Sequence, residues 1–145
     1  MSEEEKVKLK ILEEFKKQTE GKWVPELIDK TVKDVTSLEV SSYSASATIE
    51  SLIIRHSFQV SITGYDERFD GLTWGWATPG IGTSIGLVLT KDLDNLLSDT
   101  TTFWFYGTPS YLGLYFYSDD NFLGSFQGAS LSLVGGTGHG SGQWH

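Results

Sequence analysis

Apolar and polar residues alternate along most of the chain after about Leu38, which is the pattern of strands with one buried face. The alternation is clearest from Tyr43 to Ile49 and again from Leu52 to Ile62, with a connection near Glu50. Glycine, proline and aspartate then divide the rest of the chain into further strands. The eight predicted strands cover about 38–49, 52–63, 69–78, 81–90, 100–106, 110–118, 122–133 and 135–144. This pattern predicts a mainly β protein, either a sandwich or a small closed barrel.

The last predicted strand has glycine at 136, 138, 140 and 142 and ends on Trp144. Alternate residues of a strand face the same side, so one face of this strand would carry no side chains. Such a face is needed where rings or another backbone approach closely. A flexible Gly/Ser tail is the alternative.

An eight-stranded barrel is just wide enough for side chains to fill it. Five tryptophans, six tyrosines and eight phenylalanines are available for this purpose. We therefore expect a packed interior without a central pocket.

The first part of the chain has a helical period instead. We expect a helix over 3–20, ended by Gly21, and a shorter one over 25–35. The apolar stripe of the first helix is Val7, Ile11, Leu12 and Phe15. These helices would form an N-terminal segment, 1–36, ahead of a barrel domain, 37–145. The stripe would cover an apolar patch on the same barrel or on a second copy, which makes a homo-oligomer one expectation.

Charge and cysteine content narrow the function. Residues 1–33 hold eight basic and eight acidic side chains, whereas 34–145 hold three and eleven, so the whole net charge of −8 lies in residues 34–145. Such an acidic domain repels phosphate backbones, so we expect no nucleic-acid partner. The chain has no cysteine and hence no disulfide or thiolate metal site. The N-terminus shows no apolar signal-peptide core, so the sequence leaves localisation open.

Several motifs between Ile62 and Trp144 resemble the virulence-associated protein (Vap) family of actinobacterial pathogens. The matching segments are 62–64, 67–71, 77–80, 90–94, 102–105, 107–109, 123–124, 126–127 and 138–144. The resemblance spans roughly residues 40–144 and leaves out the predicted N-terminal helices.

The resemblance implies a compact eight-stranded antiparallel barrel of Greek-key type with a packed interior. It also implies no catalytic centre and no cofactor, and it supplies no functional residues. Members of the family are exported proteins associated with survival inside phagocytes. The family's usual signal peptide is not evident here.

Two residues invite a catalytic interpretation. Ser84 lies in a G-x-S-x-G sequence, which acts as a nucleophile elbow only where a strand turns into a helix. Because residues 87–90 continue as strand, we expect a glycine-rich corner instead. His56 lies on the apolar face of its strand and is expected to be a hydrogen-bonded core residue rather than a general base.

Acidic groups and the remaining histidines give no clear metal or catalytic site. Asp66, Glu67 and Asp70 surround Arg68, which favours a turn held by local salt bridges over acid–base chemistry. Asp92 begins like a calcium loop but lacks the required glycine, so it is expected to cap a helical turn. A metal site at His139 or His145 would need carboxylates from elsewhere.

Aromatic side chains of two neighbouring strands are the candidate binding residues. They are Trp104, Tyr106, Tyr115 and Tyr117, beside Tyr111. Both faces of these strands read as apolar, so the outward face is either covered by the N-terminal helix or exposed for binding.

The leading hypothesis is a non-enzymatic Vap-like barrel that acts through its surface on a protein or membrane partner. The alternatives are a carbohydrate-binding module with exposed aromatic rings, a self-assembling structural protein, or a hydrolase using Ser84.

Overall fold

The computed structural model describes residues 40–145 except 76, 109–110 and 131–135. These residues form eight strands and one short helix. The elements are β1 (Ser41–Ser51), β2 (Arg55–Ile62), β3 (Arg68–Trp74), β4 (Gly80–Thr90), α3 (Leu93–Asp99), β5 (Thr102–Thr108), β6 (Tyr111–Ser118), β7 (Asn121–Ser130) and β8 (Gly136–Trp144). All eight predicted strands are therefore confirmed, with shifts at their ends. The predicted helices over 3–20 and 25–35, and with them the whole 1–36 segment, lie outside the described residues.

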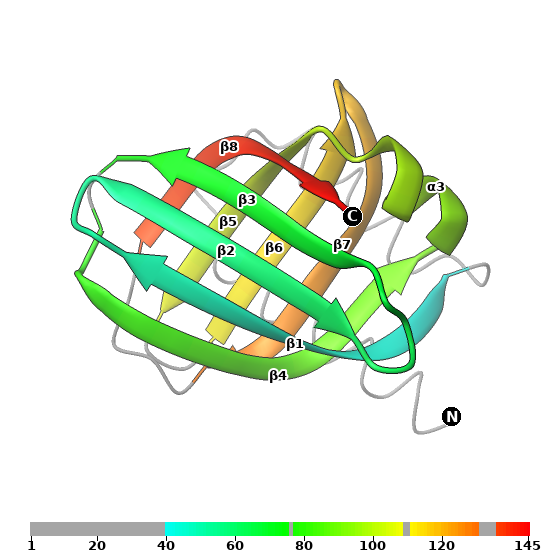
Figure 1. Ribbon diagram of the computed structural model, residues 1–145, viewed down its shortest axis with the longest axis horizontal. Coiled ribbons are helices and arrows are strands. Elements are labelled where there is room, and N and C mark those ends of the chain that lie inside the picture. Colours follow the sequence, from blue (N-terminus) through cyan, green and yellow to red (C-terminus); the bar gives the residue numbers. More distant parts are fainter. Residues whose placement is uncertain (1–39, 76, 109–110, 131–135) are drawn as a thin grey trace.

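The strands close into an antiparallel barrel in the order β1-β2-β3-β8-β5-β6-β7-β4 (Figure 1). Within this ring, β4-β1-β2-β3 and β8-β5-β6-β7 each have the spatial order of a Greek key. If each of β1–β4 is exchanged with its counterpart among β5–β8, the order of the strands around the barrel stays the same. The barrel is thus built from two topologically equivalent halves joined through β3–β8 and β7–β4.

The glycine-rich strand β8 closes the barrel between β3 and β5, so the expectation of a structural strand is confirmed. Its glycines face inward, where a side chain would collide with existing groups. A Cβ at Gly138 would lie 2.7 Å from the Phe105 ring, and one at Gly142 would lie 2.5 Å from the Phe69 ring. At Gly140 the added atom would meet the Leu72 carbonyl of β3. Rings and backbone therefore occupy the space that the glycines leave.

Phenylalanine rings from facing strands fill the interior. Phe58 and Phe105 have ring centroids 4.8 Å apart, and Phe69 and Phe116 have theirs 4.9 Å apart. Together with aliphatic residues of β1, β4 and β6 and with Trp144, they form one buried cluster. Edge-to-face and tilted ring pairs of this kind stabilise a core beyond the area that they bury.

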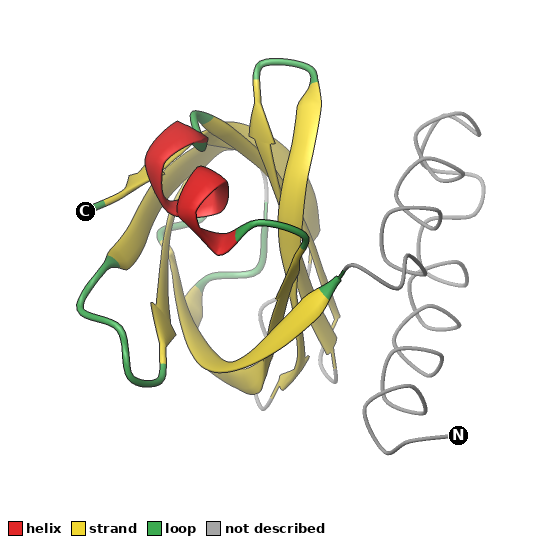
Figure 2. Cartoon of the chain, turned by 90° about the vertical axis from the view of Figure 1, so that its right-hand side faces the viewer, coloured by secondary structure: helices red, strands yellow, loops and turns green. Residues whose placement is uncertain are grey.

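The short helix α3 lies across one end of the barrel (Figure 2). Its N-cap is Asp92, whose carboxylate accepts a hydrogen bond from the Asn95 backbone N–H at 3.1 Å. Leu96 is fully buried in the core cluster and anchors the helix. The prediction of an aspartate-capped helical turn is confirmed.

One connection differs from the prediction. The sequence placed the β1–β2 connection near Glu50 and counted Leu52 and Ile54 as buried strand positions. In the structure β1 continues through Ser51, and residues 52–54 form an exposed turn before β2 begins. Leu52 and Ile54 are apolar and continue the two-residue spacing of the buried residues of β2, which explains the error.

Candidate functional site

One end of the barrel exposes a group of large apolar side chains. We call it the apolar end and define it as Leu52, Ile53, Ile54, Trp74 and Ile81. These side chains are exposed to between 43% and 72%. Strand pairing brings them to the same end, because Arg55 at the start of β2 pairs with Trp74, and Glu50 of β1 pairs with Ile81. A group of exposed large apolar residues at one end of a barrel indicates an interaction surface.

Backbone hydrogen bonds hold the β1–β2 turn at this end. The Leu52 N–H donates to the Arg55 carbonyl at 2.8 Å. The carbonyls of Ile53 and Ile54 accept from the N–H groups of Ala77 and Gly75, at 3.1 and 3.0 Å. Ile53 has a φ of 81°, in the left-handed region that a β-branched residue rarely adopts. The surrounding hydrogen bonds thus fix an exposed isoleucine in a strained conformation.

The opposite end of the barrel is acidic. Residues 40–145 contain nine acidic side chains, and eight of them lie at or near this end. They are Asp66, Glu67, Asp70, Asp92, Asp94, Asp99, Asp119 and Asp120, in the β2–β3 and β6–β7 turns, in β3 and around α3. Only two of the three basic residues in this range, Arg68 and Lys91, accompany them, whereas the apolar end carries Glu50 and Arg55. The barrel is therefore polarised along its axis.

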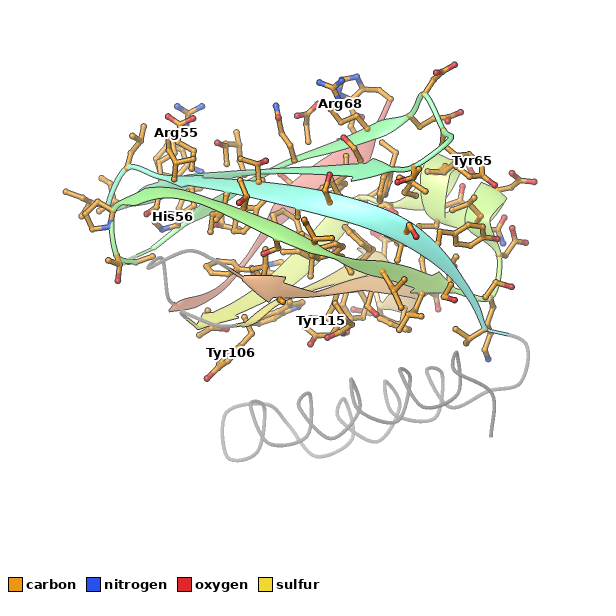
Figure 3. The ribbon with its side chains drawn as sticks, turned by 90° about the horizontal axis from the view of Figure 1, so that it is seen from below. Arg55, His56, Tyr65, Arg68, Tyr106 and Tyr115 are labelled. Carbon is orange, nitrogen blue, oxygen red and sulfur yellow. The ribbon has the colours of Figure 1, made fainter. Side chains whose placement is uncertain are left out.

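The predicted aromatic binding residues differ in how far they are exposed to solvent. Tyr106 of β5 and Tyr115 of β6 point away from the barrel interior, on the lower side in Figure 3. Tyr106, Tyr115 and Tyr117 are nonetheless buried, and only Trp104 retains 36% exposure. The sequence left two alternatives for this outward face, covered or exposed for binding, and these burial values favour the covered one. The proposed cover by the N-terminal helix concerns residues outside the described range.

Neither catalytic candidate has an accessible reactive group. Ser84 is buried within the continuous strand β4, so the helix that a nucleophile elbow requires is absent at this position. The ring of His56 is buried, with Nε2 2.8 Å from the Gly75 carbonyl and Nδ1 2.8 Å from the Ser51 hydroxyl. A carbonyl only accepts hydrogen bonds, so Nε2 carries the proton. The expectation of a hydrogen-bonded core histidine is confirmed.

The sequence predicted local salt bridges between Arg68 and the acidic residues around it. The structure shows different contacts for this segment. The Asp70 carboxylate contacts the ring of His145 at the end of the chain. The backbone of Arg68 pairs with that of His145, with N–H to carbonyl distances of 2.9 and 3.0 Å in the two directions. Long-range pairing of β3 with the tail therefore replaces the local pairs. Within the described residues, no three acidic or histidine side chains gather into a metal site.

The comparison with known proteins decides the family. The profile of the Rhodococcus equi virulence-associated protein family matches residues 2–145. The chain belongs to this family. No curated protein sequence matches the chain.

Two solved structures of Vap proteins from the intracellular pathogen Rhodococcus equi are similar to the chain. VapD has 27% sequence identity and a TM-score of 0.70, and the match covers 73% of this chain and 98% of VapD. VapB has 34% identity and a TM-score of 0.68, with 73% and 97% covered. The Vap-type barrel expected from the sequence motifs is thus confirmed.

Sequence reasoning missed the apolar end. A signal was present, because Leu52, Ile53 and Ile54 are three consecutive apolar residues and therefore break the alternation of a half-buried strand. No helix in the described part of the chain is long and apolar enough to span a membrane.

Proposed function

We propose that this Vap-family protein is a non-catalytic, membrane-binding protein that attaches to lipid bilayers through its apolar end. The observation that carries the proposal is the turn Leu52–Ile54, which presents three aliphatic side chains to solvent beside Trp74 and Ile81. Burying one such isoleucine in an apolar phase contributes about 1.5–3 kcal/mol. A few of these side chains would be enough for reversible attachment.

The conformation of Ile53 supports a role outside folding. A residue in the left-handed region costs of order 1–3 kcal/mol unless it is glycine or, to a lesser degree, asparagine. Ile53 is 43% exposed, so packing within the chain leaves much of its side chain in solvent. Folding alone would favour glycine or asparagine here, and an aliphatic side chain is better explained by a ligand that buries it.

The shape and charge of this end favour a lipid surface over a protein partner. The five side chains sit on a turn and two strand ends, and a standard protein interface needs about 20–30 residues from each partner. A small apolar tip suits shallow insertion of about 5–10 Å, with the tryptophan ring at the headgroup level. Because the acidic groups lie at the opposite end, insertion of the apolar end keeps them away from the bilayer. The net charge of −8 disfavours anionic lipid, so zwitterionic bilayers are the preferred target.

Co-sedimentation of the full chain with vesicles tests the proposal. Pure phosphatidylcholine vesicles should bind the protein, and vesicles containing phosphatidylserine should bind it no better. The variant Ile53→Asn/Ile54→Asn should bind at least about tenfold more weakly, since each isoleucine removed costs about 1.4 kcal/mol or more of insertion energy. Asparagine tolerates the left-handed conformation, so the fold should survive the change.

Ile85→Asn is the matched control. Ile85 is 75% exposed on the outer face of β4, away from the apolar end, and its replacement should leave vesicle binding unchanged. Absence of binding to both vesicle types would overturn the proposal and leave a protein partner as the remaining explanation. Equal losses in the control and in the test variant would overturn it as well.

A further inference from the structure

A groove of about 510 Å³ runs along the outer face of β2, β3 and β8. Strand pairing arranges its side chains in two rows. Gln59, Asp70 and Gln143 form one row across the three strands, and Ser57, Leu72 and Ser141 form the next. The groove lies beside the acidic end, separate from the β1–β2 turn.

The groove side chains offer both donors and acceptors in a compact array. Each glutamine amide supplies two donors and an acceptor, each serine hydroxyl supplies both, and the carboxylate of Asp70 accepts. Gln59 and Gln143 are exposed and free to turn toward a ligand. Two strand spacings separate their strands, about 10 Å, which is wider than one sugar ring. A hydroxyl-rich ligand of at least two rings matches this spacing.

Asp70 is held in place within the groove. Its carboxylate contacts the His145 ring, and the backbone of His145 is itself paired with Arg68. A carboxylate oriented in this way keeps acceptor capacity for a ligand, because each of its two oxygens has two lone pairs. Pre-oriented polar groups of this kind lower the entropic cost of binding.

Two aromatic side chains lie on the same outward face, next to the residues that line the groove. Trp104 lies two residues beyond Thr102 on β5, and His139 lies two residues before Ser141 on β8, so both share the outward face. Their rings are tilted by 43° to one another with centroids 4.8 Å apart, and Trp104 remains 36% exposed. An exposed indole face gives apolar contact to the C–H face of a sugar ring. Planar polar side chains beside an aromatic platform are what a sugar requires for recognition.

Other ligand classes fit less well. A peptide cannot add as a strand, because the closed barrel has no free edge and β2, β3 and β8 are each paired on both sides. A phosphate or sulfate ester would meet Asp70 with no lysine or arginine among the groove residues. We propose that this groove binds a neutral oligosaccharide, a site that is independent of the membrane-binding apolar end.

Saturation-transfer NMR and calorimetry on the full chain test this inference, with maltotriose, cellotriose and mannotriose as probes. At least one of the three should bind with a Kd of about 1 mM or below. Gln59→Ala/Gln143→Ala should weaken that binding at least about tenfold, since it removes two surface amides without touching the core. Trp104→Ala should also weaken it, through loss of the aromatic platform.

Two controls separate this site from other effects. Thr83→Ala changes an exposed, outward position of β4, two strands away from Gln59 across β1, and should leave sugar binding unchanged. Ile53→Asn/Ile54→Asn should also retain it, so loss of membrane attachment and loss of sugar binding are distinguishable. Binding of none of the three sugars, or binding that survives the double glutamine replacement, would overturn the inference.

Discussion

The two strands that pair with β5 differ in the side-chain volume that they place in the barrel interior. On one side, β6 directs Leu112, Leu114 and Phe116 into the core, and Tyr115 points outward. On the other side, β8 directs only glycines inward until Trp144, and its outward residues are polar. The same hydrogen-bonded ladder thus joins β5 to a strand rich in large side chains and to one that has almost none.

The difference shows how a narrow barrel accommodates many rings. The rings of Phe103 and Phe105 on β5 and of Phe69 on β3 lie against positions where β8 or β3 has glycine. Interiors are packed to near-crystalline density, so volume added by one strand has to be left free by another. In this barrel β6 supplies volume and β8 leaves room for it. This division can be tested by removing atoms from one strand and adding them to the other.

The largest effect on stability is expected from removing a buried ring of β6. Phe116 of β6 is fully buried against Phe69 and Trp144. Phe116→Ala should lower the free energy of unfolding by about 3–5 kcal/mol, through lost burial and a residual cavity. Urea denaturation measures this change. A loss below about 1 kcal/mol would mean that the interior collapses around the gap and that the packing is not tight.

Adding an inward side chain to β8 should lower the free energy of unfolding by somewhat less. In Gly140→Val the new side chain meets the Leu72 carbonyl, which is backbone and cannot turn aside. We expect a loss of about 3 kcal/mol, at the upper end for overpacking. Ser141→Val, on the outward face of the same strand, is the control and should stay within about 0.5 kcal/mol of wild type. Equal stability of both variants would show that β8 does not need its glycines.

A third change tests whether a ring and a glycine are matched as a pair. Gly138→Val should cost about 1–3 kcal/mol, because its side chain meets the Phe105 ring edge. Combining it with Phe105→Leu should recover part of that loss, with a coupling energy of at least about 0.5 kcal/mol in a double-mutant cycle. Simple additivity of the two single changes would argue against direct competition for the space.

The smallest effect is expected at the end of β8. His145→Ala removes the contact with Asp70 but keeps the backbone pairing with Arg68. Both side chains are substantially exposed, so the loss should be about 1 kcal/mol or less, and smaller still at high salt. Thermal unfolding at low and high ionic strength measures it. A loss of several kcal/mol would show that the contact between His145 and Asp70, rather than the backbone pairing, closes the barrel.

Local pattern was sufficient to predict the strands and their faces. The two-residue period located β2 near His56 and identified that histidine as a core residue, and glycine at every second position revealed the inward face of β8. The aspartate before α3 was recognised as a cap. These features depend on neighbours within a few positions, which is the range over which sequence periodicity carries information. The period was misleading at Leu52–Ile54, where consecutive apolar residues belong to an exposed turn, and after Trp74, where β3 ends before the predicted residue 78.

Long-range arrangement was decided by the tertiary structure. The sequence offered a sandwich or a barrel, and only pairing between distant strands fixed the closed order in which β8 lies between β3 and β5. The same closure joins Asp70 to His145 instead of to nearby Arg68, and it gathers Ile53, Trp74 and Ile81 at one end. The physical reason is that alternation specifies which face of a strand is buried but not which strand lies beside it. Partners far apart in the sequence meet only when the barrel closes.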